Sequence, residues 1–206
     1  MFHKTQTLYL ILLLALGMFT ACKDEGDDPA PNETLEVQTA TDVYEAEGYA
    51  FFDLESGQML SKSDSSGTQW DLAFDGTSII TNSGISGPGE GGAQIIDGVF
   101  EEVDMAPGSG YATDGEASLA IPGGGGNGWY NYTDNNGNPA HAILPIPGKL
   151  ILLKTGEGNY AKVEIISYYE GNPDTTTEEF ASLETRPESG HYTFQYMVQP
   201  NGSTDF

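Results

Sequence analysis

The chain has 206 residues, enough for one domain of ordinary size with a hydrophobic core. Glycine (27 residues) and aromatic residues (11 Tyr and 9 Phe among them) are frequent along it, which favours an all-β or β-rich fold. Seven Lys and Arg against 31 Asp and Glu give a net charge of -24. Such a charge repels phosphate backbones and anionic lipid surfaces, so it argues against nucleic acid as a partner and gives only a weak indication of cation binding.

The first 21 residues have the pattern of an export signal. Lys4 precedes an apolar run, residues 8–19, that is too short to be a comfortable transmembrane helix. Residues 19–22 read Phe-Thr-Ala-Cys and resemble a bacterial lipobox, with Phe19 where Leu is usual. Cys22 is the only cysteine of the chain, and we expect it to be lipidated and to become the mature N-terminus. Cleavage by the ordinary signal peptidase is the alternative.

Residues 22–40 are expected to be a lipidated, flexible, acidic tether. The run Lys-Asp-Glu-Gly-Asp-Asp at 23–28 resembles the surface-export tags of some Gram-negative lipoproteins, and Pro29 and Pro31 follow it among few apolar residues. Several acyl chains on one Cys anchor a protein firmly, because each buried CH₂ contributes ~0.8 kcal/mol. We therefore expect a lipid-anchored protein of the outer membrane, exposed at the cell surface.

From residue 41 onward the apolar residues follow a period of two, which indicates β-strands. Trp70, Leu72 and Phe74 alternate with polar or small residues and are expected on one face of a strand. Turns are expected at 57–58 and at 75–76. The predicted strand segments in this half are 49–54, 70–74, 78–81 and 94–100.

The second half gives a clearer pattern. Residues 149–154 form a short apolar run and residues 160–169 a longer one, and the glycine-containing turn between them predicts a β-hairpin. A last strand is expected at 192–198, with its aromatic residues on one face. Only residues 176–184 offer a short helix, and the four consecutive glycines within 122–128 indicate a loop.

Residues Gly87 to Gly92 fit the spacing G-x-G-x-x-G of a dinucleotide-binding loop. That site needs a helix directly after the glycines, but the chain reaches Gly98 too soon for one, and Glu90 would sit among the phosphates. No Lys occupies the P-loop position either. The glycines are therefore interpreted as structural, allowing positive φ or close approach of two backbone segments.

The same stretch, WDLAFDGTSIITNSGISGPGEGGAQ, resembles a segment of HmuY-type haem-binding lipoproteins. GNGWYNYT, GKLILLKTGEGNYAKVEIISYY and YTFQYMVQPNG also resemble that family, in the same order, so that the resemblance spans about residues 41 to 202. It implies one HmuY-like domain over residues 41–206, built mostly of antiparallel sheets. It also implies a surface lipoprotein that captures haem or a related tetrapyrrole and passes it to an outer-membrane receptor of the TonB-dependent type.

A haem site needs an apolar cleft and axial donors, usually His or Met. The resemblance implies two axial His in the founding member, but here one position corresponds to about Asp134, and the segment that should carry the other, 117–121, is short and has no His. His141 and His191 are the only histidines after the export signal, and Met105 is a soft donor on a loop. We consider iron ligation by His141 with Met105 or a second donor. A hydrogen-bonded surface histidine at 141 and an exposed His191 are the alternatives.

A porphyrin can also be held with little axial help, by packing on aromatic side chains. Trp129, Tyr130 and Tyr132 lie in the region that the resemblance associates with the pocket. They are candidates for stacking on a porphyrin face, and they fit a core or a sheet surface equally well.

Other ligand classes stay open. The loop Asp134 to Asn138 is rich in oxygen donors and suits Ca²⁺, although it lacks the spacing and terminal Glu of an EF-hand, and an Asx turn explains it better. A glycan or a peptide would suit a divergent member of the same surface family. The chain has no G-x-S-x-G or H-E-x-x-H motif and no Cys in the domain, so we expect a non-catalytic protein.

Overall fold

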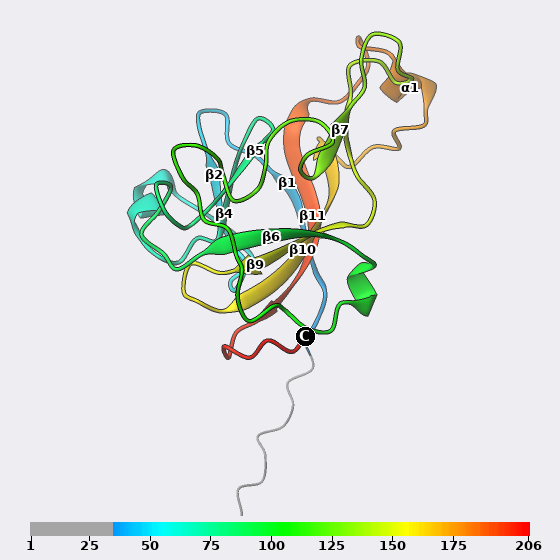
Figure 1. The fold of residues 1–206 in the computed structure, drawn as a ribbon. Helices are drawn as coiled ribbons and strands as arrows, with labels where there is room; N and C mark the ends of the chain where they lie inside the picture. Colours follow the sequence, from blue (N-terminus) through cyan, green and yellow to red (C-terminus); the bar gives the residue numbers. More distant parts are fainter. Residues whose placement is uncertain (1–34) are drawn as a thin grey trace, which may run out of the picture. The chain divides into compact units, whose positions relative to one another are not determined.

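A computed structural model describes residues 35–206, which form two antiparallel sheets packed face to face and a separate two-stranded hairpin (Figure 1). The predicted signal peptide (1–21), Cys22 and most of the tether lie outside the described residues. Within 35–206, no helix is both long and apolar enough to cross a membrane. The expectation of a β-rich fold built mostly of antiparallel sheets is confirmed.

The larger sheet has five strands in the order β1-β11-β10-β9-β6, and every neighbouring pair is antiparallel. The predicted hairpin of β9 and β10 has the predicted limits, because a glycine-containing turn joins two apolar runs directly. The strands are β1 (Gln38–Val43), β6 (Gly92–Asp97), β9 (Lys149–Lys154), β10 (Tyr160–Tyr169) and β11 (Ser189–Gln199).

The smaller sheet has four strands in the order β3-β2-β4-β5, and β7 with β8 forms a third, two-stranded sheet. Helical structure in 35–206 is limited to two 3₁₀ turns, η1 (Lys62–Ser66) and η2 (Phe100–Glu102), and the single turn α1 (Glu178–Ala181). The strands are β2 (Ala50–Asp53), β3 (Gln58–Leu60), β4 (Leu72–Asp75), β5 (Ser78–Thr81), β7 (Tyr130–Tyr132) and β8 (Ile143–Pro145).

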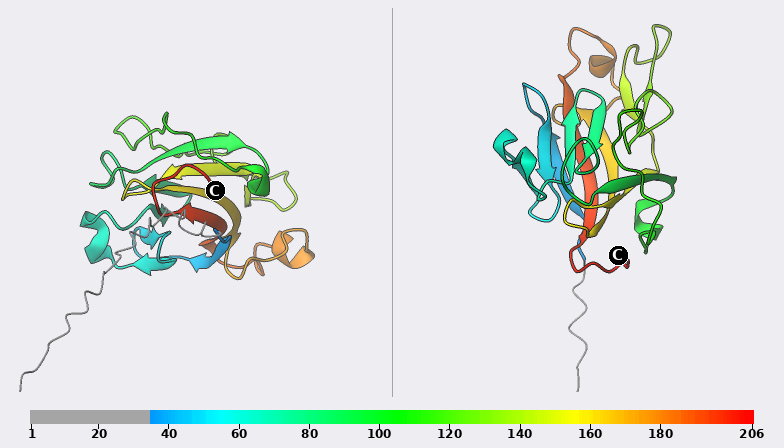
Figure 2. Two further views of the ribbon diagram at one scale, coloured as in Figure 1. Left: turned by 90° about the horizontal axis from the view of Figure 1, so that it is seen from below. Right: turned by 60° about the vertical axis from the view of Figure 1, so that its left-hand side comes forward.

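The main core lies between the two sheets, whose stacking is visible in Figure 2. Alternate residues of β11 point inward, as the period of two predicts. The ring centroid of Phe74 in β4 lies 4.5 Å from that of Tyr192 and 5.4 Å from that of Phe194, while Phe52 in β2 meets Phe194 edge-on at 5.2 Å. Burying each large side chain contributes roughly 1.5–3 kcal/mol, so this aromatic layer joins the sheets.

One expectation about this core is wrong. Trp70 does not share a face with Leu72 and Phe74, but packs on the other side of the small sheet, where its ring lies 5.0 Å from that of Phe51. The reason is a tertiary contact: Asp71 turns its carboxylate inward to accept the backbone N–H of Leu54, and regular pairing of β4 starts only at Leu72. The alternation therefore does not extend back to Trp70.

Several element boundaries also differ from the sequence expectation. Strand β1 begins at Gln38, inside the segment predicted as tether, because Ala40 and Val43 are buried against β11. Strand β6 ends at Asp97, and η2 follows in place of a continued strand. The predicted helix over 176–184 shortens to α1, whose first turn is capped by the Thr177 hydroxyl accepting the N–H of Phe180.

The glycine-rich loop packs around one buried side chain, that of Asn82 at the end of β5. A Cβ atom on Gly89 would lie 2.7 Å from the backbone oxygen of Asn82, and one on Gly91 would lie 2.6 Å from it. The Asn82 amide donates to the carbonyl of Trp70, and its Oδ1 accepts the N–H of Gly89. The loop leads into strand β6 at Gly92, with no helix after it. Close backbone approach thus explains these glycines.

We predict that Gly91→Val destabilises the domain by about 1–3 kcal/mol, because the new side chain overlaps the Asn82 backbone and forces it to move. The midpoint of urea unfolding measures this change. Gly108→Val is the matched control, because a Cβ at Gly108 meets nothing within 4 Å. Equal midpoints for the two variants would contradict the packing role of the loop.

Candidate ligand site beside strand β8

Two hollows flank β8 at the end of the large sheet where β10 ends. The larger has a volume of about 620 Å³ and the smaller of about 270 Å³. Ile143 lines the smaller hollow, and its neighbours Leu144 and Pro145 line the larger one. Strand β8 is therefore the wall between two separate candidate sites.

A β-bulge forms the apolar floor of the larger hollow. The register of β10 against β11 pairs Ile165 with Phe194 and then Ser167 with Thr193, so Ile166 is an extra residue without a partner. Its side chain is 42% exposed, although it is large and apolar. Ile165 and Ile166 both line the hollow, opposite β8 residues. The bulge thus places an apolar surface where a regular strand would not.

The other walls of the larger hollow are also mainly apolar. Leu144, Pro145 and Pro147 contribute from β8 and the turn that follows it. Glu164 is the one ionisable group among the lining residues, and its two oxygens accept the N–H of Gly148 and the side-chain amide of Gln195. Its carboxylate is therefore committed to internal hydrogen bonds.

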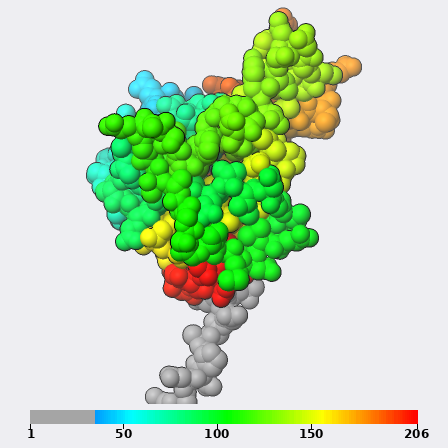
Figure 3. Space-filling view, viewed as in Figure 1, coloured from blue at the N-terminus to red at the C-terminus, as the bar shows by residue number. Residues whose placement is uncertain are grey.

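Arg186, the only arginine of the chain, fixes the smaller hollow. Its Nε donates to the carbonyl of Phe180 at 2.8 Å, its Nη1 to that of His141 at 3.0 Å and its Nη2 to that of Ala140 at 2.8 Å. The guanidinium also lies 4.8 Å from the centre of the Phe180 ring. Arg186 thereby joins the loop of the β7–β8 hairpin to α1, and the two segments project together in Figure 3.

His141 lies in this loop with a positive φ of 52°, which is uncommon for a residue other than Gly. Its Nδ1 is hydrogen-bonded to the Tyr132 hydroxyl, and its Nε2 lies 2.7 Å from Oδ1 of Asn135. Both ring nitrogens are thus engaged, as in the alternative of a hydrogen-bonded surface histidine. Ligation of an iron by His141 would require one of these bonds to break.

The three aromatic residues predicted to stack on a ligand occupy two different environments. Trp129 and Tyr130 are 1% and 6% exposed and belong to the main core, where the Trp129 ring lies 5.2 Å from that of Tyr192. The indole N–H of Trp129 donates to the carbonyl of Thr77. Tyr132 is 52% exposed. Of the three, only Tyr132 presents its ring at the surface.

Met105 is exposed, but it lies far from His141. It is bridged to Asp205, and the nearby carbonyl of Val103 accepts a hydrogen bond from Lys162 near the start of β10. His141 lines the smaller hollow together with Tyr168 and Tyr169, which end β10. In Figure 1 this end of β10 lies away from the C-terminus of the chain. Seven residues of strand separate Lys162 from Tyr169, or about 23 Å. The structure therefore does not bring His141 and Met105 to one iron.

His191 is half-buried, so the expectation of an exposed residue is wrong. Its ring stacks on that of Tyr44 with a centroid distance of 4.1 Å, and its Nε2 is buried. It lines neither hollow.

The loop from Asp134 to Asn138 is an Asx turn: Oδ1 of Asp134 accepts the N–H of Asn136 at 2.8 Å, and its carbonyl accepts that of Gly137. That arrangement agrees with the Asx-turn interpretation of the oxygen-rich loop.

A family model described as HmuY protein matches residues 45–196. The chain belongs to the HmuY family. Its fold is similar to that of an apo HmuY analogue from Tannerella forsythia (TM-score 0.53, 18% identity, 82% of this chain and 97% of that chain). It is also similar to apo PinO from Porphyromonas gingivitis (TM-score 0.53, 13% identity, 81% and 99%). A Bacteroides vulgatus protein, whose name proposes heme binding and likeness to HmuY, matches with a TM-score of 0.47, 17% identity and coverage of 78% and 91%. A comparison with curated proteins finds no match.

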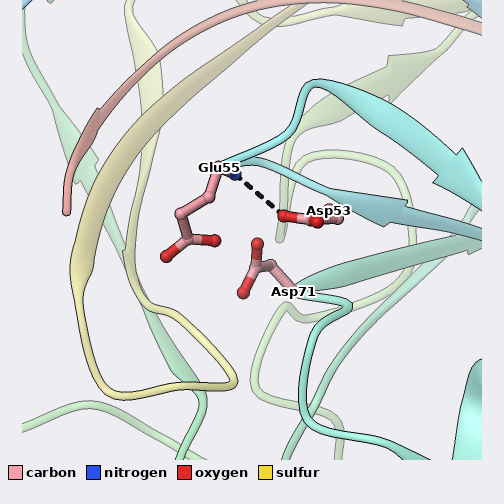
Figure 4. A group of neighbouring side chains, drawn as sticks. All are labelled: Asp53, Glu55 and Asp71. Atoms are coloured by element: carbon pink, nitrogen blue, oxygen red, sulfur yellow. Dashed lines mark hydrogen bonds between the residues drawn. The ribbon is translucent and has the colours of Figure 1, made fainter.

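The domain of this HmuY-family chain also holds an acidic cluster that the sequence did not reveal (Figure 4). Asp53, Glu55 and Asp71 each place a carboxylate oxygen within 4.8 Å of the others. Asp71 is 2% exposed, and its two oxygens accept the N–H groups of Leu54 and Gly156, both at 2.8 Å. Burial, with the nearby Glu55 charge, raises the pKa of Asp71 to about 8. Asp53 is the last residue of β2 and Glu55 lies in the turn that follows it. No local signal in the sequence predicts that Asp71 joins them.

We predict that folding stability falls as the pH rises from about 4 to about 8. The pKa of Asp71 is about 8 in the folded state and near its ordinary value of 3.8 in the unfolded chain, so the folded state binds more protons in this window. Asp71→Asn cannot release this proton and is expected to flatten the dependence. Urea unfolding at pH 5, 6.5 and 8 measures the slope, with the exposed Glu102→Gln as control. The same slope in wild type and Asp71→Asn would contradict this role for Asp71.

Proposed function

We propose that this protein is a non-catalytic surface lipoprotein that binds a tetrapyrrole, with haem as the first candidate, in the larger hollow beside β8. The observation that carries this proposal is an apolar hollow of about 620 Å³ in a domain of the HmuY family. Its volume lies within the range of roughly 300–1,000 Å³ usual for small-molecule and cofactor sites.

The residues present fit the porphyrin better than they fit the iron. Leu144, Pro145, Ile165 and Ile166 offer apolar surface to a flat macrocycle, and burying that surface contributes roughly 25 cal/mol per Å². Asn131 and Thr175 supply polar side chains that suit the carboxylates of a porphyrin edge. None of the residues lining this hollow is a His, Met or Cys. We infer that packing holds the ligand, with little axial help.

This mode differs from iron ligation by His141. His141 lines the smaller hollow, on the other side of β8, and both its ring nitrogens are hydrogen-bonded. Trp129 and Tyr130 are buried in the core and cannot stack on a porphyrin. The aliphatic side chains of the larger hollow would pack on the porphyrin face in their place.

The remaining parts of the proposal concern location and transfer. Lipidation of Cys22 would anchor the protein in the outer membrane, with its domain at the cell surface. The lipobox-like residues before Cys22 support this location. A surface protein that holds haem by apolar packing can release it to a receptor without breaking an iron bond. We propose that the bound ligand passes to a TonB-dependent outer-membrane receptor for iron acquisition.

We predict a saturable Soret change when haemin is titrated into the protein, and at least tenfold weaker binding in Ile166→Asp. The aspartate removes apolar contact and places in the hollow a negative charge that repels the porphyrin carboxylates, while the exposed position of Ile166 leaves the fold intact. Ile85→Asp is the control, because Ile85 is 63% exposed and lines neither hollow. No saturable change, or equal binding by both variants, would contradict the site.

A second prediction separates packing from ligation. If packing holds the porphyrin, His141→Ala leaves the Soret position of the haemin complex unchanged and alters its affinity less than threefold. Met105→Ala, remote from both hollows, is the matched control. A shifted Soret band in His141→Ala alone would assign His141 to the iron and overturn the packing mode.

A further inference from the structure

The smaller hollow has different chemistry from the larger one. Its volume of about 270 Å³ lies below the usual range for cofactor sites, so a tetrapyrrole does not fit it. Three parts of the chain enclose it: the β7–β8 hairpin, the end of β10, and the segment from α1 to β11. Because Arg186 joins the first part to the third, the hollow is preformed.

Tyr168 presents a hydroxyl to this hollow. Its side chain is 6% exposed and packs its ring against that of Trp129, yet its hydroxyl makes no hydrogen bond with any residue of the described part of the chain. Burial raises the pKa of Tyr168 to about 12, so the hydroxyl is neutral and able to donate. The hydroxyl is therefore free to bind a ligand in the hollow.

Two further hydroxyls line the same hollow. The Tyr169 oxygen accepts the N–H of Ile143 at 2.9 Å, which leaves its own proton free to be donated. Ser189, at the start of β11, adds a hydroxyl that both donates and accepts. Leu183 and Pro187 supply apolar wall between these groups. The lining thus combines hydroxyl groups with apolar side chains.

The charged groups of the hollow are already satisfied. The Arg186 donors are directed at backbone carbonyls, and both ring nitrogens of His141 are hydrogen-bonded. No carboxylate is among the lining residues. A neutral ligand rich in hydroxyl groups fits these conditions.

We propose that the smaller hollow binds one neutral pyranose unit, either free or at the end of a glycan. The three hydroxyls match sugar hydroxyls, since both donate and accept, and the carbon-bound hydrogens of a pyranose suit the apolar side chains of Leu183 and Pro187. This site is separate from the proposed tetrapyrrole site, because β8 lies between the two hollows.

The test is an NMR titration of the ¹⁵N-labelled protein with a panel of neutral hexoses and their methyl pyranosides. At least one sugar is expected to give saturable shifts at the amides of Tyr168, Tyr169 and Ser189. Binding of the methyl pyranoside assigns the site to a glycan end, and binding of the free sugar alone assigns it to a monosaccharide. No saturable shift with any sugar would overturn the proposal.

Tyr168→Phe removes only the unpaired hydroxyl and is expected to weaken sugar binding roughly five- to tenfold, the size of one neutral hydrogen bond. Tyr160→Phe, the same change at the other end of β10, is the control. Leu183→Arg, at a side chain that is 65% exposed, fills the rim without disturbing the core and is expected to abolish binding. Unchanged affinity in Tyr168→Phe and Leu183→Arg would overturn the site. Haemin binding by both variants is expected to stay as in wild type.

Discussion

The packing of the loops around the end of β5 depends on the fully buried side chain of Asn82. Its amide donates to the carbonyls of Gly67 and Trp70 at 3.0 and 2.8 Å, and its Oδ1 accepts the N–H of Gly89 at 2.9 Å. The backbone of the turn between β9 and β10 approaches this amide at Gly156, where a Cβ would lie 2.9 Å from Nδ2. An unpaired amide buried inside a protein is costly, so we expect the segments that contact Asn82 to pack in a cooperative way. The glycines provide the space for that packing.

A second set of contacts links the small sheet to the hairpin beside the ligand hollows. The turn between β4 and β5 offers its carbonyls to the large sheet and to the hairpin: Gly76 accepts the Tyr192 hydroxyl at 2.8 Å, and Thr77 accepts the indole N–H of Trp129. Trp129 directly precedes β7, and β7 pairs with β8, which separates the two hollows. Contacts remote from the hollows therefore connect the β4–β5 turn to the hairpin that carries β8.

The sequence predicts those features that short-range patterns determine. The hairpin over 149–169 has the expected limits because its two runs and its turn are contiguous, and the family resemblance correctly indicates the fold. Long-range contacts escape such reasoning. The inward turn of Asp71 reverses the face of Trp70, and the carbonyls that hold Arg186 include two more than forty residues away. The bulge at Ile166 depends on the register of β10 against β11, which no pattern within β10 reveals.

The porphyrin can be located on the protein by NMR with zinc protoporphyrin, a diamagnetic analogue of haem. We predict saturable shifts at Leu144, Ile165 and Ile166, with the amides around His141 changing little. Shifts centred on His141 and the smaller hollow, or no saturable shifts, would contradict the claim that the apolar hollow beside β8 is the tetrapyrrole site.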